Sequence, residues 1–309
     1  MIGKKTFRVA TRPSLLATTQ TGQTVAALQA KNPGITFEII TFSTHGDLVV
    51  DKPLVAFGGT GLFVKELEQA ILDGKADFAI HSLKDMPGNQ PDEFTIAAYA
   101  RRENASDVLL TRSGNGIQDL KPGMTVGTGS PRRQLQLMNI CGEINFKDLR
   151  GNIDTRLRKL ETGEYDAIVL ASAGLYRLGK TISPTVMIDT DICIPAVGQG
   201  AIALECKADD SETIALLRTI NHVETEIAVT AERAFMRNIG GGCKFPLAAH
   251  ATISGNQVTL NTIIGSTHTG NSVIIKDSAP LSDAEKLGNS IADRMRKACF
   301  DKGISLIVG

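Results

Sequence analysis

Residues 58–82 have the sequence GGTGLFVKELEQAILDGKADFAIHS, which predicts a helix followed directly by a strand. The helix has a glycine-rich start and then apolar residues at helical spacing: Phe63, Val64, Leu67, Ala70 and Ile71. Phe78–Ser82 is a short, mostly apolar run, as expected of a buried strand. A helix that leads into a buried strand is the repeating unit of an α/β fold.

The same alternation continues on both sides of this stretch. Before it, the pattern predicts a strand at Phe7–Ala10, a helix at Leu15–Ala30 and a strand at Thr36–Phe42. After residue 100 a second series follows: strands Val108–Thr111, Thr125–Gly127, Ile144–Leu149 and Ala167–Ala171, with helices Pro131–Asn139 and Ile153–Leu160. We therefore expect two α/β domains with parallel sheets, whose ligands bind at the carboxyl ends of the strands.

From about residue 222 the pattern changes to α+β. The order is a helix, a glycine-rich loop, three strands and a last helix that opens on a capping box: Thr225–Asn238, residues 239–246, Ala248–Ile253, Val258–Ile264, Ser272–Lys276 and Ser282–Phe300. We expect a first domain of residues 1–100 and 200–218, an arginine-rich second domain of 101–199, and a third domain of 222–309.

Composition narrows the function classes. The 309 residues hold 33 basic and 33 acidic side chains, so global charge gives no support for a nucleic-acid or membrane partner. The five cysteines form no CxxC pair and have no histidines at metal spacing, which argues against a zinc site and a disulfide scaffold. The sequence has no signal-peptide pattern and no apolar run of the ~18 residues that a membrane span needs. We expect a soluble cytoplasmic protein without a metal.

The segment NIGGGCKFP (238–246) places one thiol, Cys243, directly after three glycines. Glycine permits positive φ and a close approach of another group to the backbone, so Cys243 is well placed to carry a covalent attachment. The alternative is a helix C-cap followed by a small buried cysteine.

Arginines and hydroxyls follow several predicted strands. The segment GTGSPRRQ (127–134) puts two arginines at a helix N-terminus, where free N–H groups attract anions. The other members of the set are Arg12, Ser14, Arg150, Arg156 and Arg177. Each alone is explained as ordinary surface, and 127–134 alone as a solvated basic turn. Together they predict a crevice for one polyanion.

Lys84 and Asp85 follow the strand Phe78–Ser82 and would lie at the mouth of the same crevice. A carboxylate among arginines could stabilise a cation that develops during a reaction. The alternative is a Lys–Asp surface turn closed by Pro87.

His81 could act as a general base, but a packed strand histidine is the simpler interpretation. The glycine-rich residues 58–61 lack the Lys-Ser/Thr ending of a phosphate loop.

Taken together, these segments resemble the hydroxymethylbilane synthase (porphobilinogen deaminase) family. The resemblance extends over nearly the whole chain, in the family's order, and rests on eight segments: RVATRPS (8–14), GGTGLFVKELE (58–68), HSLKDMP (81–87), SPRRQ (130–134), LRGN (149–152), AGLYRLG (173–179), PAVGQG (195–200) and GGGC (240–243).

The resemblance implies two α/β domains like those of periplasmic binding proteins, and a smaller α+β C-terminal domain that carries the cofactor cysteine. It implies a monomeric transferase that condenses four porphobilinogens head to tail, with release of ammonia, on a dipyrromethane cofactor. The linear tetrapyrrole, hydroxymethylbilane, would then be released by hydrolysis. Acetate and propionate groups make the growing chain a polycarboxylate, which agrees with the many arginines.

The resemblance also assigns roles to residues. Cys243 would bind the cofactor through a thioether, and Asp85 would be the catalytic aspartate. Six residues would hold the cofactor: Ser82, Lys84, Thr128, Ser130, Arg132 and Arg133. Five would bind substrate or the elongating chain: Arg12, Ser14, Arg150, Arg156 and Arg177. The chain departs from the family pattern at Thr60, where many members have a lysine, and at His45, which replaces a common arginine.

Two other functions are compatible with parts of this pattern. A two-lobed protein that binds an anionic solute would explain the arginines but not the Gly-Cys segment. An α/β enzyme that handles phosphoryl groups would explain the anion sites, but the nucleotide signatures are missing.

Overall fold

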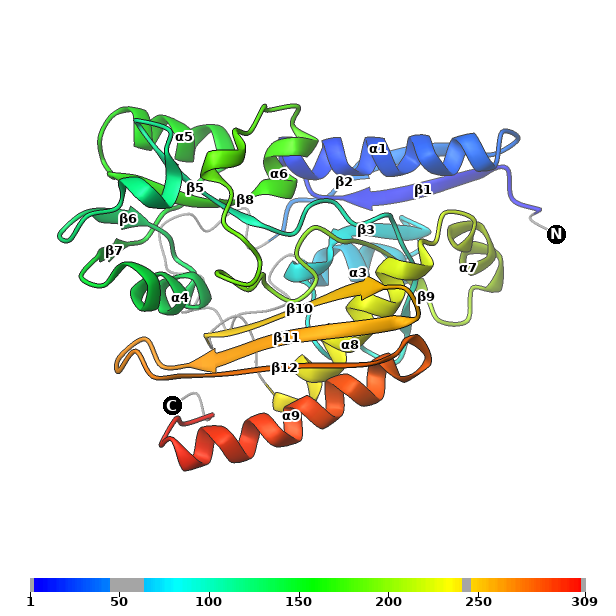
Figure 1. Cartoon of the computed structure of the whole chain (residues 1–309). Helices are drawn as coiled ribbons and strands as arrows, with labels where there is room; N and C mark the ends of the chain where they lie inside the picture. Colours follow the sequence, from blue (N-terminus) through cyan, green and yellow to red (C-terminus); the bar gives the residue numbers. More distant parts are fainter. Residues whose placement is uncertain (1–2, 45–63, 241–245, 307–309) are drawn as a thin grey trace. The chain divides into compact units, whose positions relative to one another are not determined.

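The computed structural model describes residues 3–44, 64–240 and 246–306, which form two compact units (Figure 1). Within these residues, the first unit contains 3–44, 64–103 and 200–226, and the second contains 104–199, 227–240 and 246–306. The second unit holds both the predicted arginine-rich domain and the predicted C-terminal domain. Their separation into two domains stays a prediction.

The first unit is built on a five-stranded sheet in the order β2-β1-β3-β9-β4. Its strands are β1 (Thr6–Thr11), β2 (Thr36–Thr41), β3 (Phe78–Ser82), β4 (Phe94–Tyr99) and β9 (Ile202–Lys207). Helices α1 (Leu15–Lys31) and α7 (Ser211–Arg218) bury one face of the sheet, and α3 (Lys65–Leu72) buries the other. Phe7, Phe78 and Leu204 are fully buried on the first face, as the apolar strand pattern predicts.

The second unit contains a four-stranded sheet in the order β5-β8-β6-β7. Its strands are β5 (Asp107–Thr111), β6 (Thr125–Gly127), β7 (Asn145–Lys147) and β8 (Ala167–Ala171). Helix α4 (Pro131–Cys141) packs on one face, and α5 (Ile153–Glu161) and α6 (Ser172–Arg177) pack on the other.

The two sheets share one strand order. Written from one edge, they run β2-β1-β3-β9 and β7-β6-β8-β5, with the first three strands parallel and the fourth antiparallel. In each sheet the fourth strand is distant in sequence from the strand with which it pairs. Residues 83–201 separate β3 from β9, and residues 112–166 separate β5 from β8. The prediction of purely parallel sheets is wrong for these two strands, because local alternation does not show long-range pairing.

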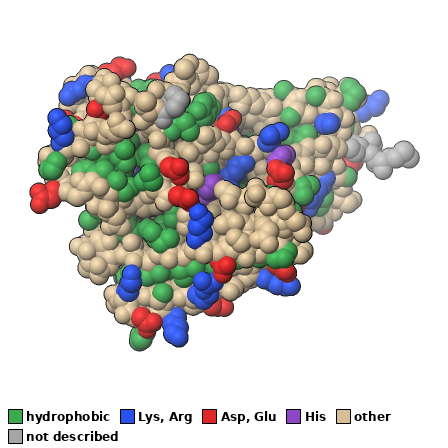
Figure 2. All heavy atoms as spheres, viewed as in Figure 1, with side chains coloured by type: hydrophobic (Ala, Val, Ile, Leu, Met, Phe, Trp, Pro, Cys, Tyr) green, Lys and Arg blue, Asp and Glu red, His purple; other side chains and the backbone are tan. Residues whose placement is uncertain are grey.

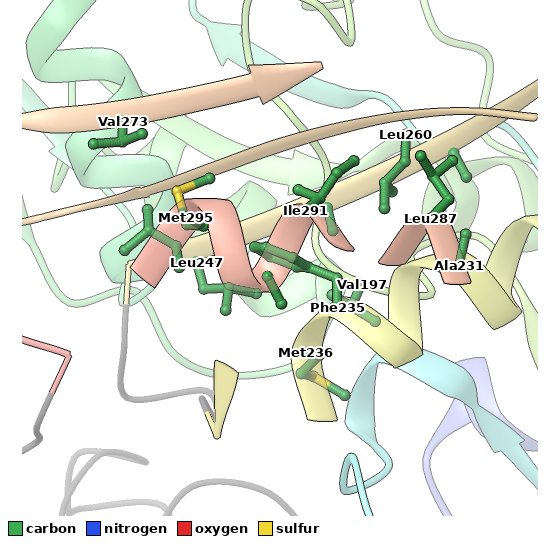
Figure 3. Close-up of a cluster of buried hydrophobic side chains, with 14 of the residues drawn as sticks. Val197, Ala231, Phe235, Met236, Leu247, Leu260, Val273, Leu287, Ile291 and Met295 are labelled. Atoms are coloured by element: carbon green, nitrogen blue, oxygen red, sulfur yellow. The ribbon is translucent and has the colours of Figure 1, made fainter. Parts of the chain in front are cut away.

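The C-terminal part of the second unit is a three-stranded antiparallel sheet packed against two helices. These elements are α8 (Val223–Ile239), β10 (Leu247–Ser254), β11 (Gln257–Gly265), β12 (Ser272–Pro280) and α9 (Ala284–Asp301). Figure 3 shows Leu287, Ile291 and Met295 of α9 among side chains of α8 and the strands. Their spacing of four residues is the apolar stripe that buries one side of a helix.

The expected fold class, two α/β sheets followed by an α+β part, is confirmed. The predicted capping box is wrong: α9 begins at Ala284 after a short 3₁₀ turn, and its N-cap Asp283 makes no side-chain capping bond. Strand β4 and helix α7 were not predicted. Helix α6 was also not predicted, so Arg177 lies at the end of a helix rather than a strand.

Surface charge agrees with the balanced composition. On the face shown in Figure 2, basic and acidic side chains are interspersed rather than gathered by sign. Among the helices of the described ranges, none is both long and apolar enough to cross a membrane.

Candidate active site

A pocket of about 90 Å³ lies at the carboxyl ends of β1 and β3 in the first unit. Five of the residues predicted from sequence line it together: Arg12, Ser14, Ser82, Lys84 and Asp85. They come from the β1–α1 connection and from the turn after β3, about 70 residues apart in sequence. The expectation that strand ends in an α/β unit bring such groups together is met in this unit.

The turn after β3 fixes where Lys84 and Asp85 lie. Leu83 and Met86 on either side of them are almost fully buried. The Leu83 N–H donates to the Ala201 carbonyl at 3.0 Å, and the Met86 N–H donates to the Leu83 carbonyl at 3.1 Å. Two buried anchors therefore hold the half-buried pair at the pocket, whereas a simple solvated surface turn would lack them.

The start of α1 supplies the other side of the pocket. Ser14 is the N-cap, and its hydroxyl accepts the Ala17 N–H at 3.3 Å. The first turn of α1 has no acidic residue, so the helix dipole adds to the positive potential of Arg12 and Lys84. An anionic group is therefore favoured in this pocket.

Gln20 is a pocket residue that sequence reasoning missed. Its side chain is 5% exposed, and its Oε1 accepts the Ser82 hydroxyl at 3.1 Å. The feature that could have identified Gln20 is the polar inner face of α1, on which Gln20, Thr21 and Thr24 are all buried. Buried polar groups on a helix face that packs on a sheet need partners, and here one partner is a predicted site residue.

His81 is a packed strand histidine, as the simpler interpretation predicted. His81 is 5% exposed, and its Nε2 lies 2.9 Å from Oε2 of Glu205. Glu205 belongs to β9 and is fully buried. Gln90 donates to the other oxygen of Glu205 at 2.8 Å. Glu205 was not predicted from sequence, because its partner lies more than 120 residues away.

In the second unit, the β6–α4 connection leads from a strand end into a helix N-terminus, as predicted; its role in anion binding stays a prediction. The buried Thr128 hydroxyl accepts the Ser130 N–H at 3.2 Å, and Pro131 is the first residue of the helix. Ser130 makes no side-chain capping bond, and the first turn of α4 has no acidic residue. The N-terminus of α4 therefore lacks a carboxylate from its own first turn.

Arg132 and Arg133 differ from the expected exposed arginines, because both are buried in a cluster around Asp107 of β5. Arg132 Nη2 lies 2.8 Å from Asp107 Oδ2, and Arg133 Nη2 lies 2.7 Å from Oδ1. Arg132 also donates to the Ile194 carbonyl at 2.8 Å and Arg133 to the Val169 carbonyl at 3.0 Å. These bonds fix both guanidinium groups in the interior of the unit.

The Asp107 cluster contains two positive groups and one negative group. Burial alone would raise the pKa of Asp107, but Arg132 and Arg133 hold it below its ordinary value. Burial raises the pKa of the adjacent Cys193 thiol to about 12, so this group is neutral. Among the described residues, the two arginines of the cluster therefore face one carboxylate, and Arg133 Nε is buried without a hydrogen-bond partner there.

The other arginines of the second unit that were predicted as site residues lie on separate elements. Arg150 is half-buried in the loop between β7 and α5, and Arg177 is half-buried at the end of α6. Arg156, in the first turns of α5, donates through Nε to the Gly151 carbonyl at 2.8 Å. Cys243, Thr60 and His45 lie outside the described residues.

Disulfides and metal clusters are the other two kinds of site that cysteine side chains can form. The four cysteines in the described part of the chain are free, and no group of three metal-binding side chains occurs there. That the protein has no metal stays a prediction from the spacing of its cysteines and histidines.

The chain matches two family models. Residues 7–215 match "Porphobilinogen deaminase, dipyromethane cofactor binding domain", and residues 226–297 match "Porphobilinogen deaminase, C-terminal domain". Relatives named porphobilinogen deaminase include one from Trichlorobacter lovleyi, 42% identical over 95% of this chain and 94% of that protein. Those from Roseiflexus sp. and Brevibacillus brevis are 44% and 43% identical, over 94% of this chain and 96% and 93% of theirs.

Proposed function

This chain belongs to the porphobilinogen deaminase family, whose members are transferases of tetrapyrrole biosynthesis, and we propose that it makes hydroxymethylbilane from four molecules of porphobilinogen. The family assignment replaces the two alternatives raised by the sequence, a solute-binding protein and a phosphoryl-handling enzyme. The observation that carries the proposal is the pocket in which Asp85 lies with Arg12, Lys84 and two serines.

In this proposal Arg12 and Ser14 bind the substrate. Porphobilinogen carries an acetate and a propionate, and Arg12 lines the pocket with Asp85. Arginine can bind a carboxylate with two parallel hydrogen bonds, and Ser14 adds a hydroxyl group. The substrate is then held with its pyrrole ring at the carboxylate of Asp85.

Asp85 stabilises the charge that forms when the substrate loses ammonia. The aminomethyl group leaves from its protonated form: the bond between the methylene carbon and nitrogen breaks, and the electron pair leaves with the ammonia, so a cation remains on the pyrrole. A carboxylate that accepts the pyrrole N–H stabilises this cation before water can attack it. After the new carbon–carbon bond forms, the pyrrole whose α-carbon attacked the cation loses the proton from that carbon, and Asp85 can accept that proton.

The second unit supplies groups that fit the family's cofactor. Dipyrromethane carries carboxylates, and in the described part of the chain the Asp107 cluster has two arginines to one carboxylate and an Arg133 Nε without a hydrogen-bond partner. We assign cofactor binding to Thr128, Ser130, Arg132 and Arg133 of this unit, together with Ser82 and Lys84 of the first unit, and covalent attachment to Cys243. When bound, dipyrromethane supplies the pyrrole carbon to which the first substrate is joined. Arg150, Arg156 and Arg177 then bind carboxylates of the elongating chain.

We further propose that the protein works as a monomer in the cytoplasm, with porphobilinogen as its partner and without a nucleic-acid or membrane partner. The support is the equal number of basic and acidic residues and their interspersed placement on the face in Figure 2.

The role of Asp85 is tested by Asp85→Ala with porphobilinogen as substrate. We expect turnover to fall about 10²–10³-fold, the usual loss when a group that stabilises transition-state charge is removed. Circular dichroism should show an unchanged fold, because Leu83 and Met86 hold the turn. The matched control is Asp73→Ala, which removes an exposed carboxylate from the end of α3 in the same unit. Equal turnover in the two variants would reject the proposed catalytic role.

A further inference from the structure

The segment PAVGQG (195–200) is a sequence motif to which the proposed chemistry gives no role. In the structure it forms a tight turn in which Gly198 and Gly200 have φ angles of 70° and 85°. Only glycine adopts this region without strain, so the two glycines fix the backbone on either side of Gln199. Gln199 itself is 1% exposed.

The amide group of Gln199 reaches the Asp107 cluster. Its Nε2 donates to the Ala105 carbonyl at 2.7 Å and to Asp107 Oδ1 at 2.9 Å. The same Oδ1 accepts from Arg133 Nη2, and Oδ2 lies next to Arg132 Nη2. Gln199 therefore fixes the carboxylate that in turn fixes both guanidinium groups.

The turn is held in place by a second buried carboxylate. Glu232 of α8 is fully buried; its Oε2 accepts the Gly198 N–H at 2.7 Å, and its Oε1 accepts the Ala251 N–H of β10 at 2.8 Å. Helix α8 and strand β10 are the two elements that flank residues 240–246 in the sequence. The turn is therefore bonded both to the arginine cluster and to the elements on each side of the cysteine segment.

A neutral donor at position 199 preserves the charge of the cluster. The amide donates to Asp107 without adding charge, so two guanidinium groups still face one carboxylate. A glutamate of the same size would remove the donor and bring a second negative group to the two arginines.

From this arrangement we infer that Gln199 is a positioning residue, which orients Arg132 and Arg133 through Asp107 and keeps their excess positive charge available to a carboxylate of the cofactor. The inference rests on the proposed cofactor role of the two arginines.

Two variants test it: Gln199→Met removes the hydrogen bonds at similar volume, and Gln199→Glu also adds a negative group. The intact mass of soluble protein under denaturing conditions gives the fraction that carries the cofactor, and the melting temperature is measured on the same samples. We expect the ratio of cofactor-carrying to bare protein to be about tenfold lower in Gln199→Met than in wild type, because a hydrogen bond to a charged group is worth at least an order of magnitude. Gln199→Glu should load less still.

The matched control is Thr262→Val, which removes the hydrogen bond from the buried Thr262 to the Ile275 carbonyl in the C-terminal sheet; neither residue is among the contacts of the cluster. It should load like wild type even if its melting temperature falls. Equal loading in the control and both Gln199 variants would overturn the inference while leaving the proposed function intact. A wild-type protein without cofactor would instead overturn the proposed function. If Gln199→Glu does not fold, the loading of Gln199→Met alone tests the positioning role of Gln199.

Discussion

The two places where basic residues gather differ in what surrounds them. In the first unit, Arg12 and Lys84 are half-buried and line a pocket with Asp85. In the second unit, Arg132 and Arg133 are buried and tied to Asp107. Similar residue types after similar strands thus have two different environments. The first group lies at a pocket, and the second forms a fixed ionic cluster inside the fold.

The strongest test of this contrast is Asp107→Asn. Removing the charge leaves two guanidinium groups buried without their partner, which costs about 3–5 kcal/mol in the free energy of unfolding. Urea denaturation at pH 7 measures this loss. An unfolding free energy within error of wild type would contradict the account of the second unit as a fixed ionic cluster.

The same variant has a predicted pH dependence. Because the pKa of Asp107 is lowered in the folded state, its contribution is complete above its unfolded pKa of about 3.9 and is lost as the pH falls below that value. The stability difference between wild type and Asp107→Asn should therefore shrink on acidification below about pH 4. A difference that stays constant across this range would argue that Asp107 does not carry the charge that holds the arginines.

A smaller effect, on activity rather than stability, is expected in the first unit. Gln20→Leu removes the acceptor of the Ser82 hydroxyl at the pocket. We expect kcat/KM to fall about fivefold, since one hydrogen bond contributes roughly 1 kcal/mol. Steady-state kinetics measure this change, with Gln23→Leu on the exposed side of the same helix as control. If both variants have wild-type kcat/KM, Gln20 does not position Ser82 for the reaction.

Much of the fold follows from local pattern in the sequence. Strand β3 has the predicted bounds, and α4 begins at the predicted Pro131, because a buried run and a proline are strong local signals. The orientation of β5 and β9 could not be predicted, since each pairs with a strand distant in sequence. The α9 boundary was misplaced because a capping-box pattern does not ensure the capping hydrogen bonds.

For the candidate site, the sequence indicates which residue types are present but not how they are buried. Nothing near Arg132 and Arg133 in the sequence shows that Asp107, more than 20 residues earlier, lies beneath them. Gln199 and Glu205 were missed for the same reason, because their partners are distant along the chain. The place of Asp85 at the pocket agrees with its position just after a recognisable strand, whereas its catalytic role rests on the family resemblance and stays a prediction.

The most direct test of the whole account is the intact mass of the purified, active protein under denaturing conditions. We predict a mass that exceeds the sequence mass by two linked pyrrole units, and a Cys243→Ser protein at the mass of the bare chain. An active wild-type protein at the bare-chain mass would contradict the account.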